Sequence, residues 1–117
     1  MLRFDDIKHM YLATEVVDLR KVINGYAILV KEVLGKDPYD DSLYIFTNSH
    51  HNKIKCLYYD GTSFWLLYKR LEKGTFKWVK KADGSSVMIS QQQLKWLLEG
   101  LTIYQEKAFK ETKYKCV

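Results

Sequence analysis

An aromatic segment in the middle of the chain, residues 57–71, constrains the fold more than any other part of the sequence. It reads LYYDGTSFWLLYKRL and places branched and aromatic residues on both sides of Asp60-Gly61. Asp and Gly tolerate the positive φ angles that a tight turn between antiparallel strands requires. The segment therefore predicts a central β-hairpin, with Asp60 and Gly61 as its structural turn.

Further short strands are expected on both sides of this hairpin. Runs of β-branched and aromatic residues predict a meander of consecutive antiparallel strands at residues 43–46, 53–59, 63–72 and 76–79. Shorter apolar runs at 10–14 and 87–89 predict additional strands. Within 53–59, lysines alternate with apolar residues, so that one face is buried while the other carries ammonium groups.

Two amphipathic segments predict helices. The first begins after Asp18, which resembles an N-cap, and ends at Gly35. The second begins at a capping box formed by Ser90 and Gln93, and its apolar stripe is expected to consist of Leu94, Leu97, Leu98 and Leu101.

A chain of 117 residues is long enough for one core and short for two. The expected fold class is therefore α+β, a single domain with an antiparallel meander of about four to five strands packed against two helices. We divide the chain into an irregular N-terminus (1–9), the domain itself (10–101) and a polar basic tail (102–117).

The cellular compartment is inferred from segments that the sequence lacks. No apolar run reaches the roughly 18 to 20 residues that a membrane span needs, and the N-terminus lacks a signal-peptide pattern. The two cysteines, Cys56 and Cys116, form no C-x-x-C pair, and Cys56 is expected to be a small core residue. These features favour a reducing, cytoplasmic location.

Positive charge is concentrated in the middle of the chain. The net charge is +5, and residues 47–81 contain eight Lys or Arg against two Asp or Glu. Aromatic residues are interleaved with these cations, a combination typical of surfaces that neutralise phosphates and stack on bases. The candidate DNA contacts are Arg20, Lys21, Lys53, Lys55, Lys69, Arg70 and Lys77. The alternative is a solvated basic face with the aromatic side chains in the core.

The sequence contains no recognisable set of catalytic residues. His50-His51-Asn52 superficially resembles a nuclease loop, and Asp60 with Glu72-Lys73 resembles a metal-dependent nuclease set, but Gly74 stands where its lysine belongs. No phosphate-binding loop, nucleophile elbow or zinc motif occurs. We therefore predict no enzyme activity, no metal site and no cofactor.

Several of these segments together resemble a known family. The sequences YLAT (11–14), DLRK (18–21), LYIF (43–46), YDG (59–61), YKRL (68–71) and FKW (76–78) are similar to the TnpB-type accessory proteins of the insertion-sequence-66 transposon family. The resemblance covers about residues 10–101. It implies a bacterial protein that assists a separate catalytic transposase, and it transfers no catalytic residue.

The function expected from these observations is a noncatalytic accessory factor in DNA transposition that contacts DNA through a basic aromatic sheet face. Its expected partners are DNA, through nonspecific phosphate contacts, the element-encoded transposase and another accessory protein. The alternative is a protein-interaction module that docks on the transposase or the sister accessory protein without binding DNA. Under the first hypothesis, charge reversal at Lys69 and Arg70 weakens DNA binding and its salt dependence.

Overall fold

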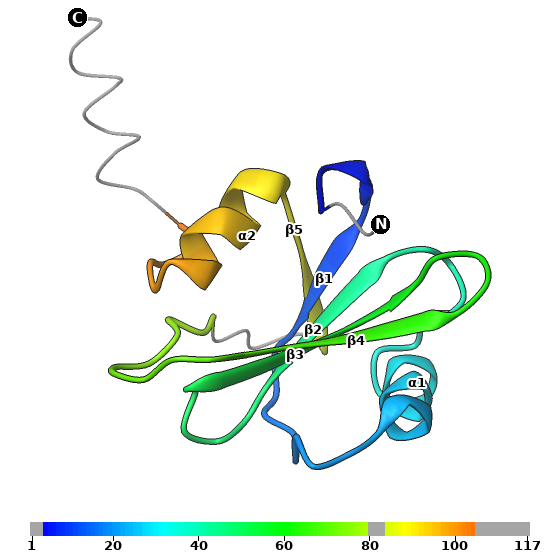
Figure 1. Ribbon diagram of the computed structural model, residues 1–117, viewed down its shortest axis with the longest axis horizontal. Helices are drawn as coiled ribbons and strands as arrows, with labels where there is room; N and C mark the ends of the chain where they lie inside the picture. Colours follow the sequence, from blue (N-terminus) through cyan, green and yellow to red (C-terminus); the bar gives the residue numbers. More distant parts are fainter. Residues whose placement is uncertain (1–3, 80–83, 105–117) are drawn as a thin grey trace, which may run out of the picture.

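The computed structural model describes residues 4–79 and 84–104, which form a five-stranded sheet with a helix on each face (Figure 1). The elements follow one another as a 3-10 turn η1 (Phe4–Asp6), β1 (Met10–Ala13), α1 (Ile23–Glu32), β2 (Leu43–Thr47), β3 (Lys53–Tyr59), β4 (Phe64–Arg70), β5 (Ser86–Ile89) and α2 (Gln91–Leu98). The predicted α+β class is confirmed, and the sheet is mostly antiparallel.

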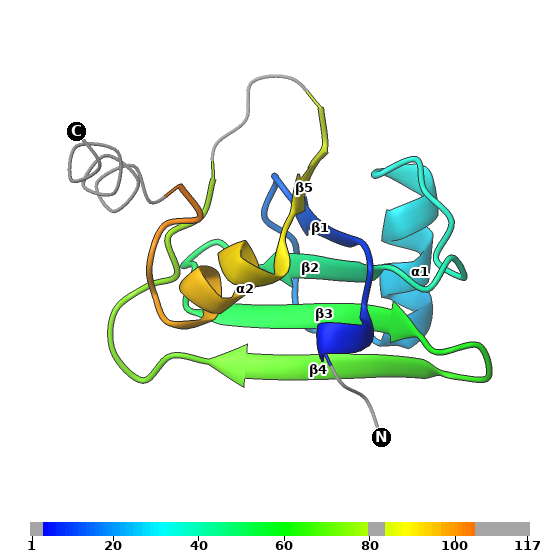
Figure 2. The same ribbon diagram turned by 90° about the horizontal axis from the view of Figure 1, so that it is seen from above.

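The strand order is β4-β3-β2-β1-β5, which Figure 2 shows from β4 at one edge to β5 at the other. The predicted meander is confirmed for β2, β3 and β4, which pair antiparallel in sequence order. β1 instead pairs parallel with β2. On its other edge, β1 pairs antiparallel with β5. A parallel neighbour requires a crossover connection, which α1 supplies.

The predicted fourth strand of the meander is wrong. Residues 76–79 leave the sheet after β4, and the backbone N–H of Phe76 donates to the His51 carbonyl. Phe76 is almost fully buried in the core beside α2, and the Trp78 indole donates to the Ala13 carbonyl at 2.7 Å. Burial of these two rings beside the sheet replaces pairing along the β4 edge, because an edge strand would leave one face of each ring in water.

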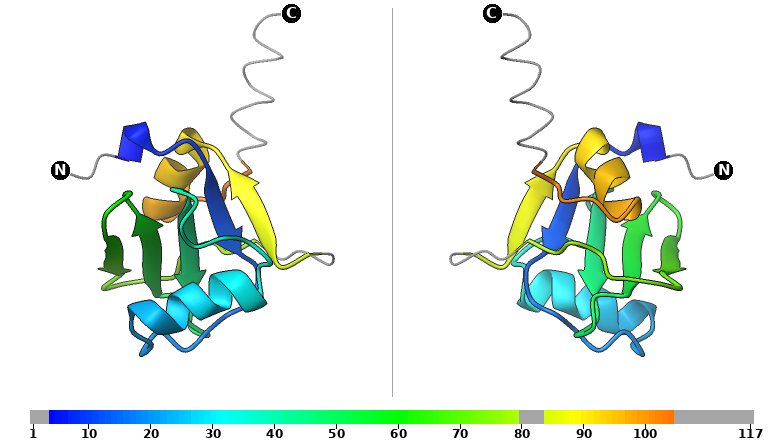
Figure 3. Two further views of the ribbon diagram at one scale, coloured as in Figure 1. Left: turned by 90° about the vertical axis from the view of Figure 1, so that its right-hand side faces the viewer. Right: turned by 90° about the vertical axis from the view of Figure 1, so that its left-hand side faces the viewer.

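Helices α1 and α2 lie on opposite faces of the sheet (Figure 3), and each face carries its own hydrophobic core. Leu43 and Ile45 of β2 belong to the core under α2, whereas Tyr44 and Phe46 belong to the core under α1. All five β2 residues are buried, as expected of a central strand covered on both sides. Cys56 lies in the α2 core as predicted, and burial raises the pKa of its thiol to about 12.

The predicted N-cap of the first helix is wrong. α1 begins at Ile23, and its N-cap residue Val22 forms no side-chain cap. The Asp18 carboxylate instead accepts from the backbone N–H and the guanidinium of Arg20, so a local turn takes the place of the first predicted helical turn. Its end is close to the prediction, because Gly35 has a φ of 65° and Lys36 N donates to Val30 O at 3.0 Å.

The capping box of the second helix is confirmed. Ser90 accepts from Gln93 N at 3.1 Å, and the Gln93 side chain accepts from Ser90 N at 2.8 Å. Leu94 and Leu97 are buried, but Leu101, predicted to lie on the same stripe, follows the helix and is exposed. Beyond it, Ile103 packs into the core under α2. Within the described residues, neither α1 nor α2 is long and apolar enough to cross a bilayer.

Candidate nucleic-acid interface

The α1 face of the sheet is covered by the helix at only one end, which is the right-hand end in Figure 1. Beside the helix lies an open groove of about 890 Å³. Residues 16–20 form one wall and the β2–β3 loop at Asn48-Ser49 another. Lys53, Lys55, Leu66 and Tyr68 of β3 and β4 project into it. Charged, aromatic and apolar groups therefore share one concavity.

The strand register explains why these residues meet. Lys55 is opposite Tyr68, and Lys53 is opposite Arg70, across the β3–β4 pair. Opposed residues share a face, and side chains two positions apart along a strand point the same way. Leu57, two positions beyond Lys55 on β3, is buried in the core under α1. Lys53 and Lys55 therefore lie on the α1 face of the sheet, as Leu57 does. The predicted alternation is confirmed and directs both lysines into the groove, but the lysine face is also partly buried, because Leu57 lies on it in the core under α1.

Lys55 lies between two tyrosine rings. Its ammonium is 5.8 Å from the ring centroid of Tyr26 and 5.8 Å from that of Tyr68, within cation–π range. Tyr26, on α1, is fully buried, whereas Tyr68 is 54% exposed. Burial and the negative charge of Asp18 together raise the pKa of Tyr26 to about 12. Lys55 thus lies between the core and Tyr68, the exposed aromatic ring among the described residues that line the groove.

Of the other two cations that line the groove, Lys53 and Arg20, the second is paired with a carboxylate. Its Nη2 donates to Asp18 Oδ2 at 2.8 Å and its Nε to Asp18 Oδ1 at 3.0 Å. The Arg20 guanidinium lowers the pKa of the Asp18 carboxyl well below its usual range. Both side chains are exposed, and exposed pairs of this kind hold each other only weakly. Among residues 4–79 and 84–104, three cations (Arg20, Lys53 and Lys55) and one carboxylate (Asp18) line the groove.

The structure does not bring the seven candidate DNA contacts into one site. Lys69 is opposite Ile54, which lies in the α2 core, so Lys69 projects from the other face of the sheet. Arg70 lies on the groove face beside Lys53, but its Nη2 donates to Glu72 at 2.9 Å. Charge reversal of the Lys69-Arg70 pair would thus alter two opposite surfaces at once.

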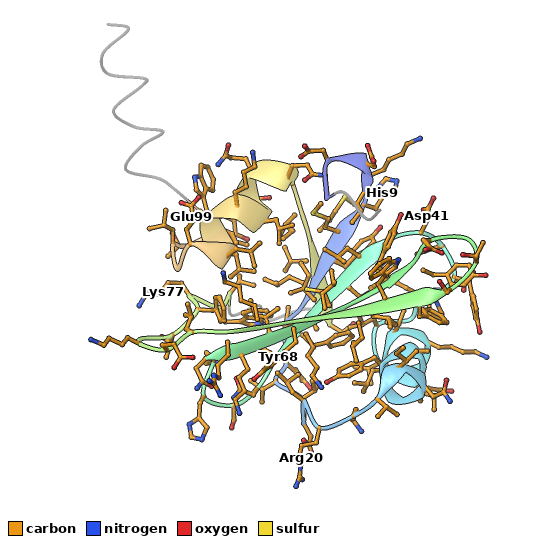
Figure 4. All side chains as sticks on the ribbon, viewed as in Figure 1. His9, Arg20, Asp41, Tyr68, Lys77 and Glu99 are labelled. Carbon is orange, nitrogen blue, oxygen red and sulfur yellow. The ribbon has the colours of Figure 1, made fainter. Side chains whose placement is uncertain are left out.

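The remaining two candidates lie away from the centre of the groove. Lys21 is exposed just before α1, and a Cβ added at Gly25 would lie 3.1 Å from the Lys21 Cβ. Because Gly25, inside α1, has no Cβ, the Lys21 side chain can pack closely against the helix there. Figure 4 shows Lys77 at the left-hand end of the molecule, well away from Arg20 and Tyr68, which both lie below the sheet. The groove therefore unites Arg20, Lys53 and Lys55 alone among the seven.

The aromatic residues that alternate with the lysines in the sequence lie in different environments in the structure. Tyr58 and Trp78 pack against the core under α2, and Tyr59 clusters with Phe64 and with Tyr39, which the sequence analysis missed. Of the five interleaved rings (Tyr58, Tyr59, Trp65, Tyr68 and Trp78), only Tyr68 lines the groove. Sequence reasoning also missed the apolar contribution of Val16, Val17 and Leu19 to the groove wall, because no local pattern places that loop beside β4.

Asp60 shapes the β3–β4 turn. Its Oδ1 accepts from the backbone N–H groups of Thr62 and Ser63, both at 2.9 Å, and its Oδ2 accepts from the Trp65 indole. Gly61 adopts a φ of 100°, which favours glycine. The backbone donors of Thr62 and Ser63 hold the pKa of the Asp60 carboxyl well below its usual range. These bonds occupy the carboxylate within the turn.

The residues that resembled a nuclease set do not converge. Asp60 precedes β4 and Glu72 follows it, which separates them by on the order of 20 Å along a seven-residue strand. Glu72 is paired with Arg70, and the His51 ring stacks on Trp78 with ring centroids 6.2 Å apart. Among residues 4–79 and 84–104, no three His, Cys, Asp or Glu side chains gather closely enough to hold a metal ion.

Fold and groove define a small α+β domain with a basic, aromatic groove beside its first helix. The chain belongs to the IS66 Orf2-like family, whose model matches residues 8–108, and is thereby an accessory protein of an insertion sequence. It is 35% identical over 92 residues to the uncharacterized protein y4hO of Sinorhizobium fredii, covering 79% of each chain. It is 34% identical over 90 residues to y4jC of the same organism, covering 77% of this chain and 76% of that one. No solved structure matches.

Proposed function

We propose that this chain is a noncatalytic accessory factor in transposition that contacts DNA through the groove on the α1 face. The observation that carries the proposal is the convergence of Lys53, Lys55 and Arg20 with the exposed ring of Tyr68 on one concavity. Cations attract phosphates irrespective of base sequence, and an exposed ring offers a face for base contact. Membership in an insertion-sequence family supports a role in which DNA is present.

The proposal predicts that the loss of groove lysines reduces both DNA affinity and its salt dependence. Each lysine that contacts a phosphate contributes about 0.9 to the slope of log K against log salt on duplex DNA. We expect Lys53→Gln and Lys55→Gln each to lower that slope by about this amount. The measurement is fluorescence anisotropy of a labelled oligonucleotide with the full chain, between about 50 and 200 mM salt.

Two lysines provide matched controls. Lys95 is exposed on α2, and Lys69 is exposed on the opposite face of the same strand pair, so Lys95→Gln and Lys69→Gln remove the same charge away from the groove. Equal losses in all four variants would show diffuse attraction to a basic protein and contradict a groove site. Unchanged binding by Lys53→Gln and Lys55→Gln in folded protein would remove the proposal.

A second function is favoured by a different surface. Tyr39, which is 60% exposed, contacts the rings of Tyr59 and Phe64 near the β3–β4 turn, with centroid separations of 4.9 and 5.1 Å. Exposed aromatic clusters are common in protein interfaces. In this alternative the chain docks on the transposase or a sister accessory protein without binding DNA. A pull-down of the transposase that persists in high salt and after nuclease treatment, and fails with Tyr39→Ser, would support it.

A further inference from the structure

The groove contains apolar surface that phosphate contact alone does not require. Val16, Val17, Leu19 and Leu66 line it together with the cations. The outer surface of a duplex presents phosphates and sugars, which polar groups and cations bind. An unpaired base, in contrast, exposes an aromatic face that gains from apolar and ring contacts. We propose that the groove binds single-stranded DNA by accommodating an unpaired nucleotide, an inference that rests on the proposed function.

Tyr68 is placed to stack on such a base. The β3–β4 pairing fixes the backbone of Tyr68, so its ring projects from a paired strand and not from a loop. Its side chain is 54% exposed, although it lies among apolar groove residues. The Lys55 ammonium, 5.8 Å from the ring centroid, is close enough to bind the phosphate attached to a base stacked there. One aromatic ring beside one cation is the arrangement that sequence-independent single-strand binding uses.

The size of the groove agrees with a nucleotide. Its volume of about 890 Å³ lies within the range of roughly 300 to 1,000 Å³ typical of pockets for small organic ligands. A space of this size admits one or two nucleotides that have left a base stack. The groove is open to solvent, so the strand on either side of the bound nucleotide can continue out of it.

The Asp18 carboxylate, which lines the groove, can also interact more favourably with a base than with the phosphates of a duplex. A carboxylate in the groove wall repels phosphates, but it accepts hydrogen bonds from the exocyclic amino groups of bases. Its pairing with Arg20 limits the repulsion and presents donor and acceptor side by side. The groove thus combines a phosphate-binding side at Lys53 and Lys55 with a hydrogen-bonding side at residues 18–20.

The test compares strands of one sequence, single and annealed, with the full chain at one salt concentration. We expect tighter binding of the single strand, and a loss of about tenfold in its affinity for Tyr68→Leu, the order of one base–aromatic stack. Tyr68→Phe keeps the ring and should bind as the parent does. Tyr104 is 59% exposed, follows Ile103 of the core under α2 and does not line the groove, so it provides the matched control Tyr104→Leu, which should also bind normally.

The outcomes separate this inference from the function on which it rests. Equal or tighter binding of the duplex, or single-strand binding that Tyr68→Leu does not weaken, overturns the inference. In that case DNA contact through the groove still stands if Lys53→Gln and Lys55→Gln weaken duplex binding. If the parent protein binds neither form of DNA, both the inference and the proposed function are wrong.

Discussion

Two buried tyrosines of the α1 core are predicted to respond oppositely to the same substitution. Tyr26 and Tyr44 are both fully buried, and each packs on an aromatic ring, Phe46 and Tyr11 respectively. The Tyr44 hydroxyl donates to Asp40 Oδ2 at 2.8 Å, with the Asp37 carbonyl as a second acceptor at 3.1 Å. The Tyr26 hydroxyl is buried without a hydrogen-bond partner in the described structure. Substitution by Phe removes one oxygen and keeps the ring.

The magnitudes follow from the hydrogen bonds. A hydrogen bond to a charged group contributes about 1.5 kcal/mol, so Tyr44→Phe should lower the free energy of unfolding by roughly that amount. A buried, unpartnered hydroxyl costs about 1 kcal/mol or more, so Tyr26→Phe should raise it by about 1 kcal/mol. At about 4 °C per kcal/mol for a domain of this size, the two melting temperatures should differ by about 10 °C.

Urea unfolding at pH 7, followed by tryptophan fluorescence and circular dichroism, measures both changes. Burial raises the pKa of Tyr26 to about 12 and also raises that of Tyr44, so both phenols are neutral under these conditions. If Tyr26→Phe destabilises the protein as much as Tyr44→Phe does, then the Tyr26 hydroxyl has a partner in solution and the reasoning from its burial is refuted.

Two further predictions concern the turn and the second helix. Because the folded-state pKa of Asp60 is depressed, its contribution to stability is present above the ordinary Asp pKa of 3.8 and is lost as pH falls below that value. Asp60→Asn should therefore flatten the acid dependence of the melting temperature, but only in part, since Asp18 shifts in the same direction. Identical acid slopes for the parent and Asp60→Asn would contradict this. Ser90→Ala removes one bond of the α2 capping box and should cost about 1 kcal/mol in urea unfolding, whereas the exposed loop variant Ser49→Ala should cost little. Equal costs in the two serine variants would mean that the cap does not stabilise the protein.

Local sequence patterns determined much of the fold. Three features each depend on residues only a few positions apart and could therefore be predicted from the sequence. They are the Asp60-Gly61 turn, the capping box at Ser90 and the end of α1 near Gly35. The prediction from Asp18 failed although it was also local, because Arg20 supplies donors that compete with the first turn of a helix. The alternation that places Lys53 and Lys55 on one face also separates Lys69 from Arg70, a consequence that follows from the strand period.

Tertiary structure alone decided the position of β1 and the existence of the groove. The parallel pairing of β1 with β2 places residues 16–20, which follow β1, beside β4, from which they are separated by more than 40 positions in the chain. The sequence therefore showed that cations and aromatic residues lie close together along the chain. It did not show that Arg20, Lys53, Lys55 and Tyr68 line one groove. Their convergence depends on long-range packing of two cores around the sheet, which no local periodicity encodes.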